Sequence, residues 1–140
     1  MKKYTVVSNI KADFKCETDI LWNKITSLSD YKWRSDINYI EVLDKHHFVE
    51  YSNKGVKTYF KTTAFIKNKY WEFELENKNI KGRWKGAFLN NGSKTTIHFT
   101  EEITPKNIFL IPFIKSYIKK QQMIYIRDLK RALHKKGYNR

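Results

Sequence analysis

The stretch 70-YWEFELENKNIKGRWKGAF-88 determines the fold, because apolar and charged residues alternate on both sides of a short turn. A two-residue loop at Lys78-Asn79 would pair the two halves as antiparallel strands. In that register, the residues of one face lie opposite each other in the pairs Trp71–Gly86, Phe73–Trp84 and Leu75–Gly82. It places opposite charges across the other face, in the pairs Glu72–Lys85, Glu74–Arg83 and Glu76–Lys81. The same register thus gives an apolar face and a face of opposite charges, which predicts a sheet with one buried face.

Turn signals on either side extend this hairpin into a meander. We expect two-residue loops at Asn68-Lys69 and at Asn91-Gly92. The first loop predicts the pairs Ile66–Trp71, Ala64–Phe73 and Thr62–Leu75. The second predicts the pairs Phe88–Thr95, Gly86–Ile97 and Trp84–Phe99. Four successive strands then share one apolar face.

Residues outside the meander supply the remaining elements. The expected order is a strand at 4–14, a helix at 18–28, a short second helix or turn at 29–34, and strands near 38–43 and 47–51. Beyond Pro105, apolar residues at helical spacing predict one long helix that begins between Ile108 and Phe113 and ends near Lys136. The sequence therefore predicts an α+β fold, in which seven antiparallel strands are joined by two short helices and covered by a long C-terminal helix.

Composition places the chain among globular proteins. A hydrophobic content of 41% excludes a disordered chain, and 140 residues suit one domain with its own core. Cys16 is the single cysteine, so no disulfide can form within the chain, which fits a reducing compartment. The N-terminal lysines precede no apolar run of the kind found in a signal peptide, and "IFLIPFI" at 108–114 is too short to span a bilayer. We expect a cytoplasmic location.

The charge is strongly basic. Lys and Arg number 28 against 14 Asp and Glu, a formal charge of +14. Such an excess favours an anionic partner, either a nucleic acid or an acidic membrane surface. The alternative is that lysine serves solubility and that the Lys, Asn, Ile and Tyr content reflects an AT-rich genome. Charge by itself does not decide between the two interpretations.

The segment 17-ETDILWNKITSLSDYKWRSDINYIEVLD-44 resembles the SRPBCC superfamily, the group of START and birch-pollen-allergen-like proteins. The matching features are Trp22 in the first helix, Asp30, the bend Tyr31-x-Trp33 and the strand at 40–42. The element order and the long last helix extend the resemblance over residues 1–140 as one domain, closest to the polyketide cyclase/dehydratase-like subgroup. Glu17-Thr18 departs from the usual Ser-Pro-like start of the first helix. The resemblance implies a helix-grip fold, in which a curved sheet wraps around the C-terminal helix.

The resemblance also implies a cavity for an apolar ligand between the sheet and the last helix. We expect its ligand-binding residues to be Trp33, Phe60, Thr62, Trp71, Phe73, Trp84, Phe88, Phe99, Tyr117 and Gln121. Tyr31 and Trp33 would lie at one end of the sheet, where they either fill the core or form the floor of the cavity. Gly82 and Gly86 flank Trp84 and either leave space for a ligand or allow the sheet to coil.

Glu101 is the one candidate for catalysis. The predicted register turns it inward near Gly82, where burial would raise its pKa and make it an acid or base, with Tyr117 as partner. The alternative is that it lies beyond the covered part of the sheet and is solvated. His46 and His47 would point to opposite faces of a strand, so we expect no metal. The sequence contains no P-loop, dinucleotide fingerprint or nucleophile elbow, so we also expect no cofactor, and no obligate protein partner is evident.

Three functions remain in competition. The first is binding or carriage of a small hydrophobic molecule such as a lipid, an isoprenoid or a polyketide-like compound. The second is a cyclase or dehydratase that uses a cavity carboxylate. The third is a basic module for RNA or membrane surfaces, to which Tyr59 and Phe65 beside Lys57 and Lys61 would contribute from the outer face. The first interpretation leads, and nucleic acid is the weaker of the two anionic partners.

The segment 107-NIFLIPFIKSYIKK-120 suggests how a transient membrane contact could arise. Apolar residues precede Lys115, Lys119 and Lys120, and Pro112 favours a break before the helix. The apolar side chains either close over the core or remain exposed and enter a bilayer while the lysines meet anionic headgroups. This segment therefore predicts weak docking on acidic membranes.

Overall fold

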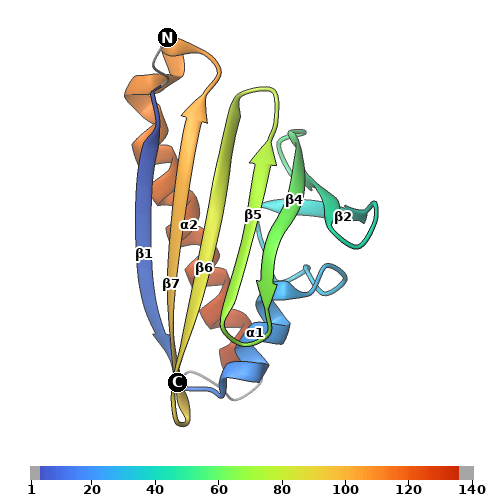
Figure 1. Cartoon of the computed structure of the whole chain (residues 1–140), viewed down its shortest axis with the longest axis vertical. Helices are drawn as coiled ribbons and strands as arrows, with labels where there is room; N and C mark the ends of the chain where they lie inside the picture. Colours follow the sequence, from blue (N-terminus) through green and yellow to red (C-terminus); the bar gives the residue numbers. More distant parts are fainter. Residues whose placement is uncertain (1–3, 136–140) are drawn as a thin grey trace.

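The computed structural model describes residues 4–135 and shows one long curved sheet with a helix across it (Figure 1). The elements in chain order are β1 (Val6–Phe14), α1 (Thr18–Thr26), β2 (Ile37–Val42), β3 (His47–Ser52), β4 (Lys57–Ile66), β5 (Tyr70–Glu76), β6 (Ile80–Asn91), β7 (Lys94–Pro105), the 3₁₀ helix η1 (Ile108–Leu110) and α2 (Ile111–Lys135). The predicted end of the last helix near Lys136 lies outside the described residues.

The seven strands form a single antiparallel sheet in the order β1-β7-β6-β5-β4-β3-β2. The helix α2 packs against β1 and β7 and runs along the concave face of the sheet, while α1 lies at one end of it (Figure 1). This arrangement is the helix-grip fold, so the predicted α+β class is confirmed. The helix α2 lies along the concave face because one side of it is apolar over its length. On this side Ile118, Leu129 and Leu133 are all buried against the sheet.

The second short helix expected at 29–34 is a pair of turns instead. The Ser27 hydroxyl oxygen accepts a hydrogen bond from the backbone N–H of Asp30, at 3.0 Å. The indole N–H of Trp33 donates to the carbonyl of Asp30, also at 3.0 Å. Side-chain hydrogen bonds of this kind compete with the helical pattern. The segment 27–36 therefore stays irregular and can follow the rim of the sheet.

The register of the central hairpin is confirmed. Phe73 lies opposite Trp84, with Trp71 opposite Gly86 and Leu75 opposite Gly82. On the outer face the Arg83 guanidinium forms ion pairs with Glu72 at 3.0 Å and with Glu74 at 3.1 Å. Apolar pairs on one face and opposite charges on the other therefore specified this pairing.

The two flanking registers differ from the prediction. In the β6–β7 turn Asn91 pairs with Lys94, so Gly92-Ser93 form the loop and Phe99 lies opposite Gly86 rather than Trp84. Gly92 has a φ of 78°, a left-handed value that favours glycine at this position. The shift is two residues, so every side chain keeps its face. Glu101 consequently lies opposite Trp84, not beside Gly82.

The β4–β5 hairpin contains a bulge that the sequence did not reveal. Asn68, with a φ of 66°, lies in a three-residue turn, and the register shifts between Thr62 and Ala64. Phe73 pairs with Thr62, so the predicted Ala64–Phe73 pair is wrong. The extra residue turns Phe65 to the concave side, where its ring lies 5.1 Å from that of Trp22. The basic-module hypothesis required Phe65 to lie on the outer face. Phe65 lies on the concave side instead, so this part of the hypothesis is wrong.

Aromatic rings dominate the concave face. The rings of Phe73 and Trp84 stack with centroids 4.8 Å apart, and those of Phe48 and Phe60 stack at 4.7 Å. The indole of Trp84 lies over Gly86, where a Cβ atom would overlap it. The missing side chain of Gly86 is thus filled by the neighbouring ring and not by a ligand. The packed rings form one wall of a cavity.

Candidate ligand-binding cavity

A cavity of about 540 Å³ lies between the concave face of the sheet, the irregular segment 27–36 and α2. This volume is within the range of small-molecule sites. Eight of the ten residues expected at a ligand site line it, namely Trp33, Phe60, Trp71, Phe73, Trp84, Phe99, Tyr117 and Gln121. The cavity exists because seven strands curve around a single helix that contacts them mainly near β1, which leaves space under β3 to β6.

Thr62 and Phe88 are not among the lining residues. The hydroxyl of Thr62 accepts a hydrogen bond from the indole N–H of Trp71 at 3.2 Å, next to the bulge of β4. The ring of Phe88 packs edge-on against Trp22 of α1, with centroids 4.9 Å apart. Both residues therefore belong to the closed end of the molecule, where α1 fills the concave face.

Tyr31 and Trp33 of the bend belong to the cavity wall. The ring of Trp33 packs edge-on against Tyr125 of α2, with centroids 5.2 Å apart. Both residues are half-buried and pack against the main core cluster. The rings of Tyr31 and Trp33 therefore contact the core and also line the cavity, so the bend contributes to both.

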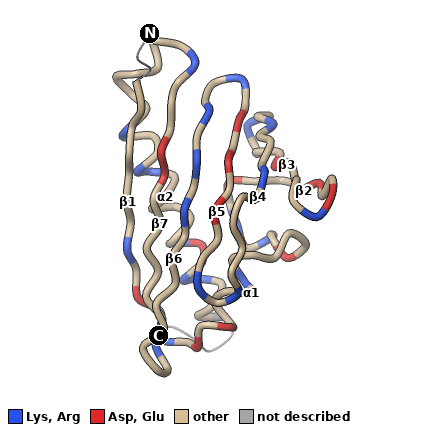
Figure 2. Tube along the Cα trace, viewed as in Figure 1, with Lys and Arg blue, Asp and Glu red and all other residues tan. Residues whose placement is uncertain are grey.

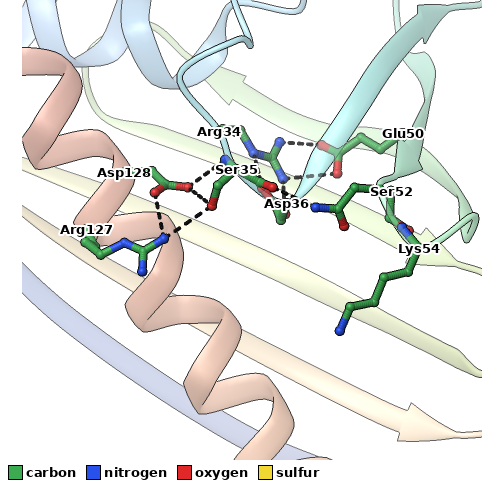
Figure 3. A network of polar contacts seen from close by, with 9 residues as sticks. Arg34, Ser35, Asp36, Glu50, Ser52, Lys54, Arg127 and Asp128 are labelled. Atoms are coloured by element: carbon green, nitrogen blue, oxygen red, sulfur yellow. Dashed lines mark hydrogen bonds and ion pairs between the residues drawn. The ribbon is translucent and has the colours of Figure 1, made fainter.

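A partly buried polar cluster interrupts the apolar wall (Figure 3). The guanidinium of Arg34 donates to Asp36 at 3.2 and 2.9 Å and to Glu50 at 2.7 and 3.2 Å. It also lies 5.3 Å from the ring centroid of Tyr125. One cation is thus shared by two carboxylates, so this cluster carries a net negative charge. Burial by itself would lower the pKa of Arg34, but Glu50 and Asp36 outweigh that effect and raise it.

Glu101 of β7 faces the same cavity. No hydrogen bond from the described residues 4–135 reaches its carboxyl group. Burial raises the pKa of Glu101 to about 7, the Glu50 carboxylate adds to the rise, and the Arg34 guanidinium opposes it. Near neutral pH this carboxyl group therefore exists in both forms, and it can donate or accept a hydrogen bond.

Two tyrosines of α2 add to the polar surface, which also includes Lys54 and Lys120. Burial raises the pKa of Tyr125, an effect that Arg34 opposes. Burial also raises the pKa of Tyr117, with further contributions from Asp36 and Glu101. Both phenols are therefore protonated at neutral pH and can donate hydrogen bonds. Tyr117 is 53% exposed, so the cavity reaches the surface beside it.

A second polar contact holds the bend against α2 (Figure 3). The buried carboxylate of Asp128 accepts hydrogen bonds from the backbone N–H and the hydroxyl of Ser35, both at 2.7 Å. Arg127 donates to the other oxygen of Asp128 at 3.2 Å. Burial would raise the pKa of Asp128, but these hydrogen bonds outweigh it and lower the pKa. Ser35 thus has a structural role that ties the cavity wall to the helix.

Sequence reasoning missed Arg34, Asp36 and Glu50 as cavity residues. A signal existed for Glu50, because it alternates with the buried Phe48 on β3 and must share its face. No comparable signal existed for Arg34 and Asp36, since the irregular bend has no period. Among the described residues no group of three His, Cys, Asp or Glu could hold a metal ion.

Comparison with known proteins supports the fold. No model of a known protein family matches the chain, and no curated protein matches it. Solved structures do match. A START superfamily protein from Mycobacterium smegmatis superposes with a TM-score of 0.81 at 10% identity, covering 94% of this chain and 97% of that one. The Zhui aromatase/cyclase from Streptomyces sp. R1128 superposes with a TM-score of 0.77 at 5% identity, covering 90% and 92%.

A third neighbour is an enzyme with its ligands bound. Norcoclaurine synthase from Thalictrum flavum, in complex with dopamine and hydroxybenzaldehyde, superposes with a TM-score of 0.71 at 9% identity, covering 95% of this chain and 88% of that one. At these identities the likeness concerns the fold. The chain has the helix-grip fold of START and SRPBCC proteins, which also occurs in polyketide cyclase-like enzymes.

Proposed function

We propose that the protein binds a small, largely apolar molecule with aromatic or polyene character in the 540 Å³ cavity. One observation carries the proposal: a cavity walled by aromatic rings contains, among the described residues that line it, a single unpaired carboxyl group, that of Glu101. Flat apolar ligands gain most from such walls, because aromatic side chains prefer stacked and edge-on contacts. Lipids, isoprenoids and polyketide-like compounds are the classes that this space suits.

The charged residues at the polar end of the cavity restrict which polar groups a ligand can carry there. Arg34 is already occupied by Asp36 and Glu50, so it offers no free cation to an anionic ligand. The Glu50 carboxylate and a partly ionised Glu101 would repel an anion. Beside Glu50 and Glu101 the cavity therefore favours a neutral or cationic polar group, such as a hydroxyl, a carbonyl or an amine, while Lys54 and Lys120 supply positive charge elsewhere in its lining. The solved norcoclaurine synthase of the same fold, in complex with dopamine and hydroxybenzaldehyde, supports a ligand of this kind.

Native mass spectrometry of the purified protein tests for a retained ligand. A tryptophan-fluorescence titration with three probes then tests selectivity: 2-naphthol, 2-naphthylmethylamine and 2-naphthoic acid. We expect the first two to bind more tightly than the acid, with the amine gaining affinity as the pH rises through about 7, where Glu101 ionises.

A cavity-filling substitution supplies the control. Gln121→Trp would occupy the cavity from α2, while Met123→Trp places the same ring on an exposed position of the same helix. We expect the first variant to lose binding and the second to keep it. Equal binding by both variants, or tightest binding of the naphthoic acid, would contradict the proposal.

A second candidate function is acid–base catalysis, which the pKa of about 7 at Glu101 favours. A carboxyl group with this pKa can take a proton from a substrate carbon or give one to a leaving hydroxyl, as a cyclisation or dehydration requires. Tyr117 would hold the carbonyl oxygen as a hydrogen-bond donor. The test uses an aryl β-hydroxy ketone, whose dehydration to an enone is followed by ultraviolet absorbance. Glu101→Gln would abolish turnover while 2-naphthol still binds, and turnover retained in that variant would exclude this role.

A further inference from the structure

Three large apolar side chains are exposed together where β7 leads into α2. Ile108 is 73% exposed, Phe109 78% and Phe113 68%. We name these three residues the apolar corner. Ile108 and Phe109 belong to η1, and Phe113 lies in the first turn of α2. Single exposed apolar residues are ordinary, but a contiguous group at one corner indicates an interaction site.

Positive charge surrounds the apolar corner. The sequence from Ile103 to Arg127 contains no Asp or Glu but includes Lys106, Lys115, Lys119 and Lys120. In Figure 2 this segment shows basic residues and no acidic ones. Lys106 forms an ion pair with Glu76. Lys119 donates to the neutral carbonyl of Asn9, so its charge is not compensated there.

The stability of α2 does not explain this charge pattern. The first turn of α2 carries no acidic residue, although the positive end of the helix dipole favours acidic side chains there. Lys115 follows directly after that turn, where a cation gains nothing from the dipole. An exposed apolar group next to uncompensated lysines is instead complementary to an anionic interface.

The apolar corner adjoins the cavity. Phe113, Tyr117 and Gln121 are spaced by four residues and therefore share one face of α2. Tyr117 and Gln121 line the cavity. The backbone N–H of Lys106, just before η1, donates to the carbonyl of Asn79 at 2.9 Å. The neighbouring residues Asn77 and Ile80 also line the cavity. The corner thus flanks the cavity where it reaches the surface beside Tyr117.

We propose that the apolar corner docks on an anionic phospholipid bilayer. Ile108, Phe109 and Phe113 enter the boundary between headgroups and acyl chains, while Lys115 and Lys120 contact lipid phosphates. Within residues 4–135 no helix is long and apolar enough to cross a membrane. The side of the cavity next to Tyr117 then faces the lipid, which gives an apolar molecule a path that avoids water. The docking step itself does not require the proposed ligand.

Liposome sedimentation of the full chain tests the proposal. The probes are vesicles of phosphatidylcholine alone and vesicles with added phosphatidylglycerol, at low and at high salt. We expect binding to the anionic vesicles only, weakened by salt. The double variant Phe109→Ser/Phe113→Ser should reduce partitioning at least about tenfold, because each buried phenyl ring contributes strongly. Lys115→Gln should reduce it about fivefold, the effect expected for one lysine at an anionic surface.

Matched controls lie at the opposite end of the sheet. Leu89→Ser removes an apolar side chain that is 61% exposed on β6, and Lys67→Gln removes an exposed charge in the β4–β5 turn. Neither should change partitioning. Equal binding to both kinds of vesicle, binding to neither, or equal losses in the control variants would overturn the proposal. Sedimentation velocity without lipid adds a further check, because a dimer that the Phe109→Ser/Phe113→Ser variant abolishes would assign the corner to a second copy of the chain instead.

Discussion

The guanidinium of Arg34 joins Glu50 through two hydrogen bonds, at 2.7 and 3.2 Å, inside the wall of the cavity that Glu101 faces. Arg34 comes from the irregular bend and Glu50 from β3, so this pair fixes the bend over the sheet. The pair also sets the electrostatic surroundings of Glu101, because Glu50 raises the pKa of Glu101 and Arg34 lowers it. The same contact therefore links the stability of the cavity to its chemistry.

Glu101→Gln should stabilise the protein at pH 8 more than at pH 5. The native pKa of Glu101 is about 7, above the ordinary value of 4.5, so the folded state holds this proton more tightly than the unfolded state. The wild type therefore loses stability as the pH rises from about 4.5 to about 7, and the glutamine variant avoids that loss. We expect a difference of about 2 kcal/mol between the two pH values. Urea denaturation of both proteins measures it, and a pH-independent difference would contradict the assignment.

Glu50→Gln should lower the pKa of Glu101. The substitution removes a neighbouring negative charge and leaves the Arg34 cation less compensated, and both changes favour the ionised form. Carbon-detected NMR titration of the Glu101 carboxyl group measures the shift. Glu74→Gln on the outer face of the sheet is the matched control and should leave the titration unchanged. An unchanged pKa in Glu50→Gln would show that Glu50 and Glu101 do not interact.

Asp128→Ala should destabilise the protein by about 2–3 kcal/mol, because it leaves the backbone N–H of Ser35 without its charged acceptor. The pKa of Asp128 is lowered in the folded state, so its contribution is present above about pH 3.8 and is lost as the pH falls below that value. Asp13→Ala removes an exposed carboxylate of β1 and should cost much less than Asp128→Ala, because exposed ion pairs contribute little to stability. Thermal and urea unfolding of both variants provide the comparison, and equal losses would argue against a special role for Asp128.

Gly86→Ala should displace the indole of Trp84, which occupies the space of the missing side chain. Because Trp84 lines the cavity and must move to make room for the new methyl group, we expect a loss of about 1–3 kcal/mol and weaker binding of 2-naphthol. Adding Trp84→Phe should restore part of the stability, because the smaller ring leaves room for the new methyl group. If the two substitutions were simply additive, the close contact between these residues would have no energetic consequence.

Much of the fold was predictable because its signals are local. The β5–β6 register follows from residues within one hairpin, where apolar and charged pairs both agree. The start of α2 between Ile108 and Phe113 follows from helical spacing over a long stretch. Glu101 was correctly turned inward even though its predicted partner was wrong, because a shift of two residues preserves the face of a strand. The bulge between Thr62 and Ala64 was not predicted, because no residue type there indicates a bulge. The bulge places Phe65 on the opposite face of the sheet from the one predicted.

By itself the sequence determined which residues alternate, that three hairpins follow one another with the central one turning at Lys78-Asn79, and that one helix must cover a long apolar face. Only the tertiary structure decided that this face encloses a cavity and that Arg34, Asp36, Glu50 and Glu101 meet at its polar end. These four residues come from the bend, β3 and β7, and a linear pattern contains no information about how far β3 and β7 curve toward each other. The pKa of Glu101 is likewise a property of the folded cavity, because burial, its main cause, arises only when the sheet has wrapped around α2.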